Sequence, residues 1–155
     1  MLLHGPHYQN AYVTRNVEKA MADFRAAADV RKEMFHEGEQ TVETPDGPQT
    51  LHNKIAFMWV EDLQYEFIEP VSGLEHVYAQ ALPDHDGVAF HHVCSRVPDW
   101  EALHAQIAQH SWTVPFESVS AGGLKYLYVD ARPWLGHYLE FTWMPDEMWT
   151  ALGGR

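Results

Sequence analysis

Two adjacent histidines and two isolated glutamates are the residues whose chemistry needs an explanation first. The histidines, His91 and His92, occur in the segment AFHHVCSRVPDW (89–100). Because successive side chains of a β-strand point to opposite faces, only one of the two can face a given site. Glu66 in YEFIEP and Glu140 in YLEFTW each stand within an otherwise apolar run. A carboxylate there is costly unless something pairs with it, so a buried partner is expected for each.

Spacing distinguishes the two histidines. Asp99 has the character of a helix N-cap after a short strand, and so does Asn16. His92 precedes Asp99 by seven positions, and Gln9 precedes Asn16 by the same seven positions. His92 is therefore the equivalent of Gln9 in an internal repeat, whereas His91 is not. A lone histidine is more often a core residue with its hydrogen bonds made than a metal ligand. For His92, a ligand role is favoured because it is in register with the two glutamates.

The elements that must position these residues repeat in the two halves of the chain. In each half a strand (10–14 or 90–97) precedes a helix with one apolar face, and Asn16 or Asp99 caps that helix. Further strands are expected at 53–60, 64–70, 113–118, 124–129 and 137–143. Both halves therefore fit a β-α-β-β-β order.

Residues typical of turns and strand ends separate the predicted strands. Segment 37–50 is acidic and contains TPDGP, so it is expected to be an exposed loop. Glu61 and Asp62 should form a tight hairpin, and Pro70 should end the strand that follows it. In the C-terminal segment PDEMWTALGGR, apolar residues at helical spacing predict a short closing helix.

The length and composition are those of one compact domain. The chain has 155 residues, of which 46% are hydrophobic and 21% charged, enough for a substantial core. The repeat divides it into a first module at about 6–70, a connector at 71–88, a second module at about 89–145 and a tail at 146–155. Within the connector, a helical turn is expected near Val77 to Leu82.

The net charge limits the classes of partner that the protein can bind, and the cysteine content indicates its cellular compartment. The formal net charge of −12 argues against nucleic acid, whose binding depends on clustered cations. No apolar run is long enough to cross a bilayer and no leader is recognisable, so a protein without membrane association is expected. The single Cys94 excludes an intrachain disulfide and agrees with a cytoplasmic location.

Four segments together resemble the vicinal oxygen chelate superfamily, which includes glyoxalase I, methylmalonyl-CoA epimerase, extradiol dioxygenases and bleomycin resistance proteins. They are QNAYVTRNVEKAM, YEFIEP, FHHVCSRVPD and YVDARPWLGHYLEF, and as an ordered set they are more specific than any one of them. The resemblance covers nearly the whole chain. It implies an α+β fold in which two tandem βαβββ modules form an open, cup-shaped mixed sheet with flanking helices. On this interpretation residues 1–155 form a single glyoxalase-like domain.

The resemblance also implies a metal site. Transferred position by position, its four ligands are Gln9, Glu66, His92 and Glu140. His7 lies two residues before Gln9, on the same face of a regular strand, and is the alternative first ligand. One imidazole, two carboxylates and an amide oxygen suit a hard or borderline divalent cation. Zinc, nickel, cobalt, manganese, magnesium and iron are all allowed, and the sequence does not distinguish among them.

Similarity to glyoxalases and epimerases implies proton transfer beside a metal-bound carbonyl, with Glu140 as the first candidate base and Glu66 as its partner. The leading hypothesis is thus an isomerase, epimerase or lyase. An iron-dependent dioxygenase is the alternative if His7 supplies a second histidine. A metal-free, resistance-type binding protein is a further alternative, but it predicts non-ligating residues at the four positions.

The substrate and assembly are less closely defined. The aromatic residues expected to line the cup suggest a small apolar or aromatic substrate; they are Phe57, Trp59, Phe67, Phe90, Tyr126, Tyr128 and Trp143. Few basic residues are available for a glutathione-like substrate, and Arg132 is the candidate for binding an anionic group. Relatives of this size often pair, so a homodimer is expected.

Overall fold

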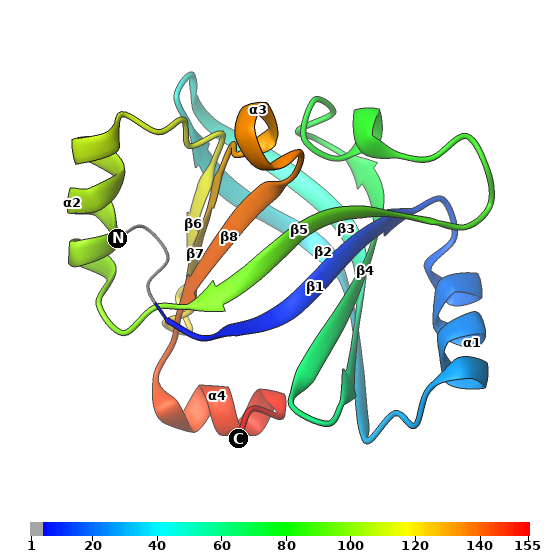
Figure 1. The fold of residues 1–155 in the computed structure, drawn as a ribbon. Helices are drawn as coiled ribbons and strands as arrows, with labels where there is room; N and C mark the ends of the chain where they lie inside the picture. The colour runs from blue at the N-terminus through cyan, green and yellow to red at the C-terminus, as the bar shows by residue number, and fades with distance from the viewer. Residues whose placement is uncertain (1–4) are drawn as a thin grey trace.

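The computed structural model describes residues 5–155, which form one mixed β-sheet with helices on its outside (Figure 1). The first half contains β1 (His7–Thr14), α1 (Val17–Ala27), β2 (Lys32–Thr44), β3 (Gly47–Val60) and β4 (Leu63–Ser72). A short 3-10 helix, η1 (Ala79–Ala81), lies in the connector. The second half contains β5 (Val88–Arg96), α2 (Trp100–His110), β6 (Glu117–Val119), β7 (Lys125–Val129), α3 (Arg132–Leu135), β8 (Tyr138–Trp143) and α4 (Asp146–Leu152).

The sheet closes on itself, and here the expectation of an open cup is wrong. Its strands follow the order β1-β4-β3-β2-β6-β7-β8-β5, and β5 pairs with β1 to complete an eight-stranded barrel. Closure on the other side depends on one pairing between β2 and β6, Glu43 with Glu117. The mixed sheet and its flanking helices agree with the α+β expectation.

The segment 37–50 accounts for this difference, because it is not a loop. β2 and β3 pair without interruption from Lys32 with Trp59 to Thr44 with Gly47, and only the turn at 45–46 separates them. The inward-facing side of β2 carries polar residues, so the sequence lacks the apolar and polar alternation that would have identified a strand. This long β2 extends far enough to reach β6 and close the barrel.

The hairpin at Glu61 and Asp62 is confirmed, since Val60 pairs with Leu63 across it. Pro70, however, does not end β4. It lies opposite Asn53, next to an irregularity in the β3–β4 register, and β4 continues to Ser72. Proline is tolerated at such irregularities because no regular ladder hydrogen bond is required from it.

Both predicted helix caps are present. The Asn16 side chain accepts a hydrogen bond from the Lys19 backbone nitrogen (2.9 Å), and the Asp99 side chain accepts one from that of Ala102 (3.0 Å). Each helix buries its apolar face against the outside of the barrel, and the two lie on opposite flanks (Figure 1). α1 packs on β3 and β4, and α2 packs on β7 and β8.

The predicted C-terminal helix is α4, which lies across one end of the barrel (Figure 1). The indole nitrogen of Trp59 donates to the Leu152 carbonyl (2.9 Å), and the Trp149 ring packs edge-on against Tyr8 with centroids 4.8 Å apart. No helix within residues 5–155 is long and apolar enough to cross a bilayer.

Candidate metal centre

Four strands that are neighbours in the barrel each contribute one of the predicted ligand positions. In the order β4, β1, β5, β8 they carry Glu66, Gln9, His92 and Glu140. Glu66 pairs with Ala11, two residues after Gln9, and Glu140 pairs with Cys94, two residues after His92. The register of the two parallel strand pairs is therefore the same, as the equivalence of Gln9 and His92 requires.

Glu66, His92 and Glu140 converge at the barrel wall. Their potential ligand atoms lie within 4.8 Å of one another, and all three residues are buried. His92 Nε2 is 2.8 Å from Glu140 Oε2 and 3.2 Å from Glu66 Oε2. Despite these short distances, neither His92 Nε2 nor Glu66 Oε2 has a partner in hydrogen-bond geometry among residues 5–155. Unpaired buried polar atoms that point at one another are costly, and a shared cation would satisfy them.

The neighbouring His91 points away from this group and holds His92 in one tautomer. His91 Nε2 lies 2.8 Å from the Val77 carbonyl oxygen, which only accepts, so Nε2 carries the proton. Burial, and then the charge of His92, lowers the pKa of His91 to about 3, which keeps it neutral. Its Nδ1 is therefore an acceptor, and His92 Nδ1 donates to it at 2.9 Å. If a cation replaced the His92 proton, the neutral imidazole would present the lone pair of Nε2 to it, as a metal-bound histidine does.

The electrostatics of the group also favour a cation. Burial alone lowers the pKa of His92, but the Glu140 and Glu66 carboxylates outweigh it and raise the pKa to about 9. Burial raises the pKa of Glu66. A positive charge between the carboxylates is therefore strongly favoured, and a divalent ion would supply it in place of the His92 proton. The donor set thus fits the divalent metals that the sequence suggested.

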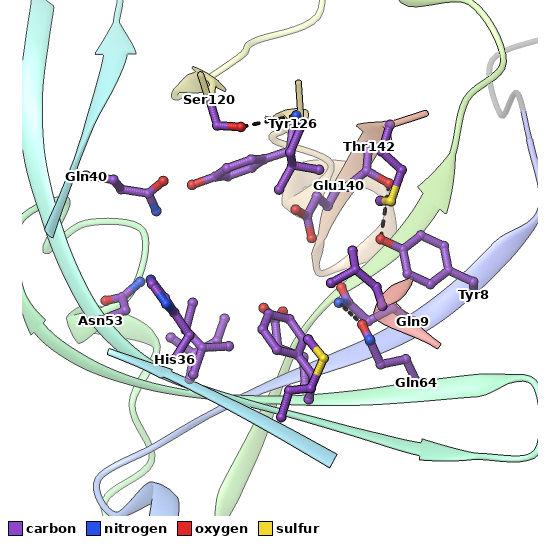
Figure 2. Close-up of a pocket in the computed structure, with 18 of the residues that line it drawn as sticks. Tyr8, Gln9, His36, Gln40, Asn53, Gln64, Ser120, Tyr126, Glu140 and Thr142 are labelled. Atoms are coloured by element: carbon purple, nitrogen blue, oxygen red, sulfur yellow. Dashed lines mark hydrogen bonds between the residues drawn. The ribbon is translucent and has the colours of Figure 1, made fainter. Parts of the chain in front are cut away.

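Gln9 supplies a further oxygen on the same wall. Its Nε2 donates to Gln64 Oε1 at 2.6 Å, which leaves its own Oε1 buried and without a hydrogen-bond partner in the described chain. Figure 2 shows the Gln9 and Gln64 amides together, with Glu140 on the same side of a central space. Gln64 was not among the predicted site residues, although its position two residues before Glu66 puts it on the same strand face. It orients Gln9 much as His91 orients His92.

The alternative first ligand, His7, lies elsewhere. It is exposed, and its Nε2 is 3.0 Å from the Gln9 carbonyl oxygen and 2.9 Å from Asn10 Oδ1. The β1–β5 register shifts between His7 and Gln9, so the alternation that would put both on one face is broken. Tyr8 and Gln9 both face the cavity instead.

Three of the candidate ligands, Gln9, Glu66 and Glu140, line a cavity of about 450 Å³ inside the barrel, whereas His92 is fully buried and does not line it. Of the aromatic residues expected to line it, Phe57, Trp59, Tyr126 and Tyr128 do so, and Tyr8, Tyr78 and Trp149 join them. Phe67, Phe90 and Trp143 are not part of the lining. Among residues 5–155 no lysine or arginine lines this cavity. The lining is therefore mainly apolar and aromatic, with a smaller number of polar side chains.

Arg132, the candidate for an anionic group, lies outside this cavity. Its guanidinium makes two hydrogen bonds to the Asp130 carboxylate (2.8 and 2.7 Å) and stacks on Tyr138 at 4.5 Å. It lines a separate surface depression with His76 and His137. The structure therefore places Arg132 and the three candidate ligands at different sites.

Comparison with protein families supports the architecture of this site. Residues 8–128 match the model of the Glyoxalase/Bleomycin resistance protein/Dioxygenase superfamily. The chain belongs to this superfamily. The resemblance to vicinal oxygen chelate proteins inferred from the sequence is thereby confirmed. A comparison with curated proteins found no match.

Solved structures with this superfamily fold are similar over nearly the whole chain. Methylmalonyl-CoA epimerase from Mycobacterium tuberculosis has a TM-score of 0.66 at 13% identity, with 96% of each chain covered. A variant of the epimerase from Streptomyces coelicolor, in complex with 2-nitronate-propionyl-CoA, has a TM-score of 0.65 at 12% identity, covering 91% of this chain and 95% of that one. At this identity the similarity establishes the fold.

Proposed function

We propose that the protein is a divalent-metal-dependent isomerase, epimerase or lyase that moves a proton at a carbon next to a carbonyl of a small apolar or aromatic substrate. The observation that carries this proposal is the convergence of Glu66, His92 and Glu140. Glu66 and Glu140 line a largely apolar cavity, and Glu66 Oε2 and His92 Nε2 have no partner in hydrogen-bond geometry among residues 5–155. Superfamily membership and the fold shared with epimerases support it.

The cation would be held by Glu66, His92 and Glu140, with the Gln9 amide oxygen as a fourth ligand. When bound, it would polarise two neighbouring oxygens of the substrate and so acidify the adjacent C–H bond. Glu140 lines the cavity and is the first candidate to accept that proton. Glu66, also at the cavity wall, has a pKa raised by burial and would take or return a proton as the second base.

The surrounding residues support this role. The Tyr128 ring contacts the imidazole of His92 at a tilt of 52°, with centroids 4.7 Å apart, and limits its movement. Burial raises the pKa of the Tyr126 hydroxyl, which therefore stays protonated and can donate to a substrate oxygen. Trp149 and Leu152 of α4 line the end of the cavity and limit the access of water.

Metal analysis of protein purified without added metal is the direct test of the ligand set. We expect about one divalent ion per chain in the wild type and its loss in His92→Ala and Glu140→Ala. His137→Ala, which changes a histidine outside the cavity, is the matched control and should keep the ion. An ion retained by both ligand variants, or absent from the wild type after reconstitution, would contradict the proposed metal site.

Proton transfer is tested with 2-hydroxyacetophenone, an aromatic α-hydroxyketone with two neighbouring oxygens. In D₂O the metal-loaded enzyme should exchange the proton beside the carbonyl, as followed by NMR, and Glu140→Gln should reduce the exchange by 100-fold or more. Oxygen consumption with a catechol, without such exchange, would favour the dioxygenase instead. Tight binding with neither reaction would favour a binding protein.

A further inference from the structure

The C-terminal segment that follows β8 contributes to one end of the cavity. Its helix α4 lies across that end of the barrel (Figure 1), and three of the segment's side chains line the cavity. Side chains from β1 and β3 pack against them. We call this part of the lining the end wall; it is apolar and aromatic and consists of Tyr8, Trp59, Met144, Trp149 and Leu152.

The end wall lies close to the candidate metal centre. Tyr8 directly precedes Gln9 on β1. Its hydroxyl is 3.1 Å from Thr142 Oγ1, and Thr142 follows Glu140 by two residues on β8. On its other side the Tyr8 ring contacts the Trp149 ring, with centroids 4.8 Å apart. A single aromatic side chain therefore connects the strands that carry two candidate ligands to α4.

Trp149 is packed firmly into the end wall. Its ring also packs edge-on against Trp59, with centroids 5.8 Å apart, and the Arg96 guanidinium lies over it, 5.1 Å from its centroid. Gly154 comes so close that a Cβ atom there would lie 2.0 Å from Trp149 Cε2, so only glycine fits. An indole packed on this many sides moves aside only at the cost of these contacts.

α4 itself is fastened at both ends. At its start, Arg96 donates to the Asp146 carboxylate (2.6 Å). At its end, Arg31 donates to the Gly153 carbonyl (2.6 Å), and Lys32 donates to a carbonyl of the last turn. A helix of seven residues is marginal by itself, and cations near its C-terminus stabilise it. Three of the ten Lys and Arg residues in the chain thus hold this helix against the barrel.

We propose that Trp149 determines the length of the substrate, because the body of the substrate extends from the metal centre toward the end wall and stops at this indole. The inference rests on the proposed function for the position of the two chelated oxygens. The direction follows from the chemistry of the lining. An apolar or aromatic body is better accommodated by the end wall than by the polar side chains on the other side of the central space, which are His36, Gln40 and Asn53 (Figure 2).

Rigid aryl hydroxamic acids test this length limit, because the hydroxamate chelates a divalent metal through two neighbouring oxygens and the body can be lengthened in steps. Phenyl, biphenyl and terphenyl bodies, each with and without a methyl group at the far end, give a graded series. Calorimetric titration of the metal-loaded wild type should show affinity rising with length up to a limit. At the next length it should fall by about 10-fold or more, because a longer body must displace Trp149.

Trp149→Ala should move the limit to a longer body and reduce the loss at the wild-type limit to within about 2-fold. Trp149→Phe keeps an aromatic ring but removes part of its volume, so it should relieve part of the loss, and it serves if the alanine variant does not fold. Trp134→Ala is the matched control. It changes an exposed tryptophan outside the cavity and should keep the wild-type limit.

Three results would overturn the length inference alone: no limit in the wild type, a limit unchanged in both Trp149 variants, or a limit that moves in Gln40→Ala instead. Failure of the whole series to bind a protein that retains its metal would also overturn it alone. Failure to bind with no metal retained would overturn the proposed function and this inference with it.

Discussion

At the level of single residues, two of the four candidate ligands are each oriented by a neighbouring side chain. His92 donates through Nδ1 to His91, and Gln9 donates through Nε2 to Gln64. In both cases the donated proton fixes which atom of the residue is left without a hydrogen bond in the described chain, His92 Nε2 or Gln9 Oε1. Since such orienting partners typically contribute 10- to 100-fold to metal affinity, they provide tests that leave the ligands themselves intact.

Replacing His91 with phenylalanine should weaken metal binding by about 10- to 100-fold, because His92 Nδ1 loses its acceptor and the imidazole is free to change tautomer. Competition with a chelator measures the affinity. His91→Gln, which restores a side-chain acceptor, should recover part of it. Unchanged affinity in His91→Phe would show that His91 serves packing alone.

The two histidines should also give the metal-free protein a stability maximum near pH 6.5. In the folded protein the pKa of His91 is lowered to about 3. In the unfolded chain this histidine has its ordinary pKa of about 6.5. Below about pH 6.5 the unfolded state therefore binds a proton that the folded state does not, and the free energy of unfolding falls as the pH decreases. The pKa of His92 is raised to about 9. Its contribution to the free energy of unfolding is therefore complete below about pH 6.5 and is lost as the pH rises through 9. Thermal unfolding between pH 4 and pH 10 checks this.

His91→Phe should remove the histidine part of the acid limb, and His92→Phe should remove the alkaline limb. A bound divalent ion excludes the His92 proton, so the alkaline loss should also be weaker in the metal-loaded protein. A metal-free profile that stays flat from pH 6.5 to pH 9.5 would contradict the assigned charge of His92.

At the level of the elements, the closure of the barrel has one weak connection. β2 and β6 share a single pairing, and both residues in it are glutamates, Glu43 and Glu117. Like charges directly opposite each other in a sheet are destabilising. His104 offsets part of this, since its Nε2 lies 3.1 Å from Glu117 Oε1. The seam between the two halves is therefore held less strongly than the β2–β3 hairpin, which pairs along its whole length.

Glu43→Lys should stabilise the protein by roughly 0.5–1 kcal/mol, because it replaces this repulsion with an opposite-charge pair. Urea unfolding measures the change, and the gain should shrink at high salt. Glu39→Lys, at an exposed position of β2 whose cross-strand partner is His52 rather than a glutamate, is the control and should give a smaller gain. Destabilisation by Glu43→Lys would mean that the seam is held by other contacts.

At the level of the whole molecule, the candidate centre joins strands from both ends of the sequence, so a bound cation should stabilise the complete fold. An ion at 100 times its dissociation constant contributes about 2.7 kcal/mol. For a chain of this size that corresponds to a rise in Tm of roughly 5–10 °C. Thermal unfolding with and without a chelator should show this rise in the wild type and in His137→Ala. An equal rise in His92→Ala would place the ion elsewhere.

The assembly of the molecule stays a prediction. A homodimer was expected from relatives of similar size, and sedimentation of the metal-loaded protein tests it. The cavity and the three candidate ligands are formed by residues of one chain.

Several features followed from the sequence alone because local rules determine them. The caps Asn16 and Asp99, the hairpin at Glu61 and Asp62 and the C-terminal helix depend on residues close together in the chain. The equivalence of Gln9 with His92 was inferred from a repeated spacing, and the matching register of β1–β4 and β5–β8 is consistent with it. Superfamily membership followed from the ordered set of motifs.

The tertiary structure decided what depends on long-range pairing. The bulge that turns His7 outward, the β2 strand that replaces the predicted loop, and the closure of the barrel at Glu43 are set by partner strands. The polar inner face of β2 concealed the strand, because residues such as Gln40 face a cavity rather than a packed core. For the same reason Asn53 gave no signal in the sequence, whereas Gln64 could have been found from its position two residues before Glu66.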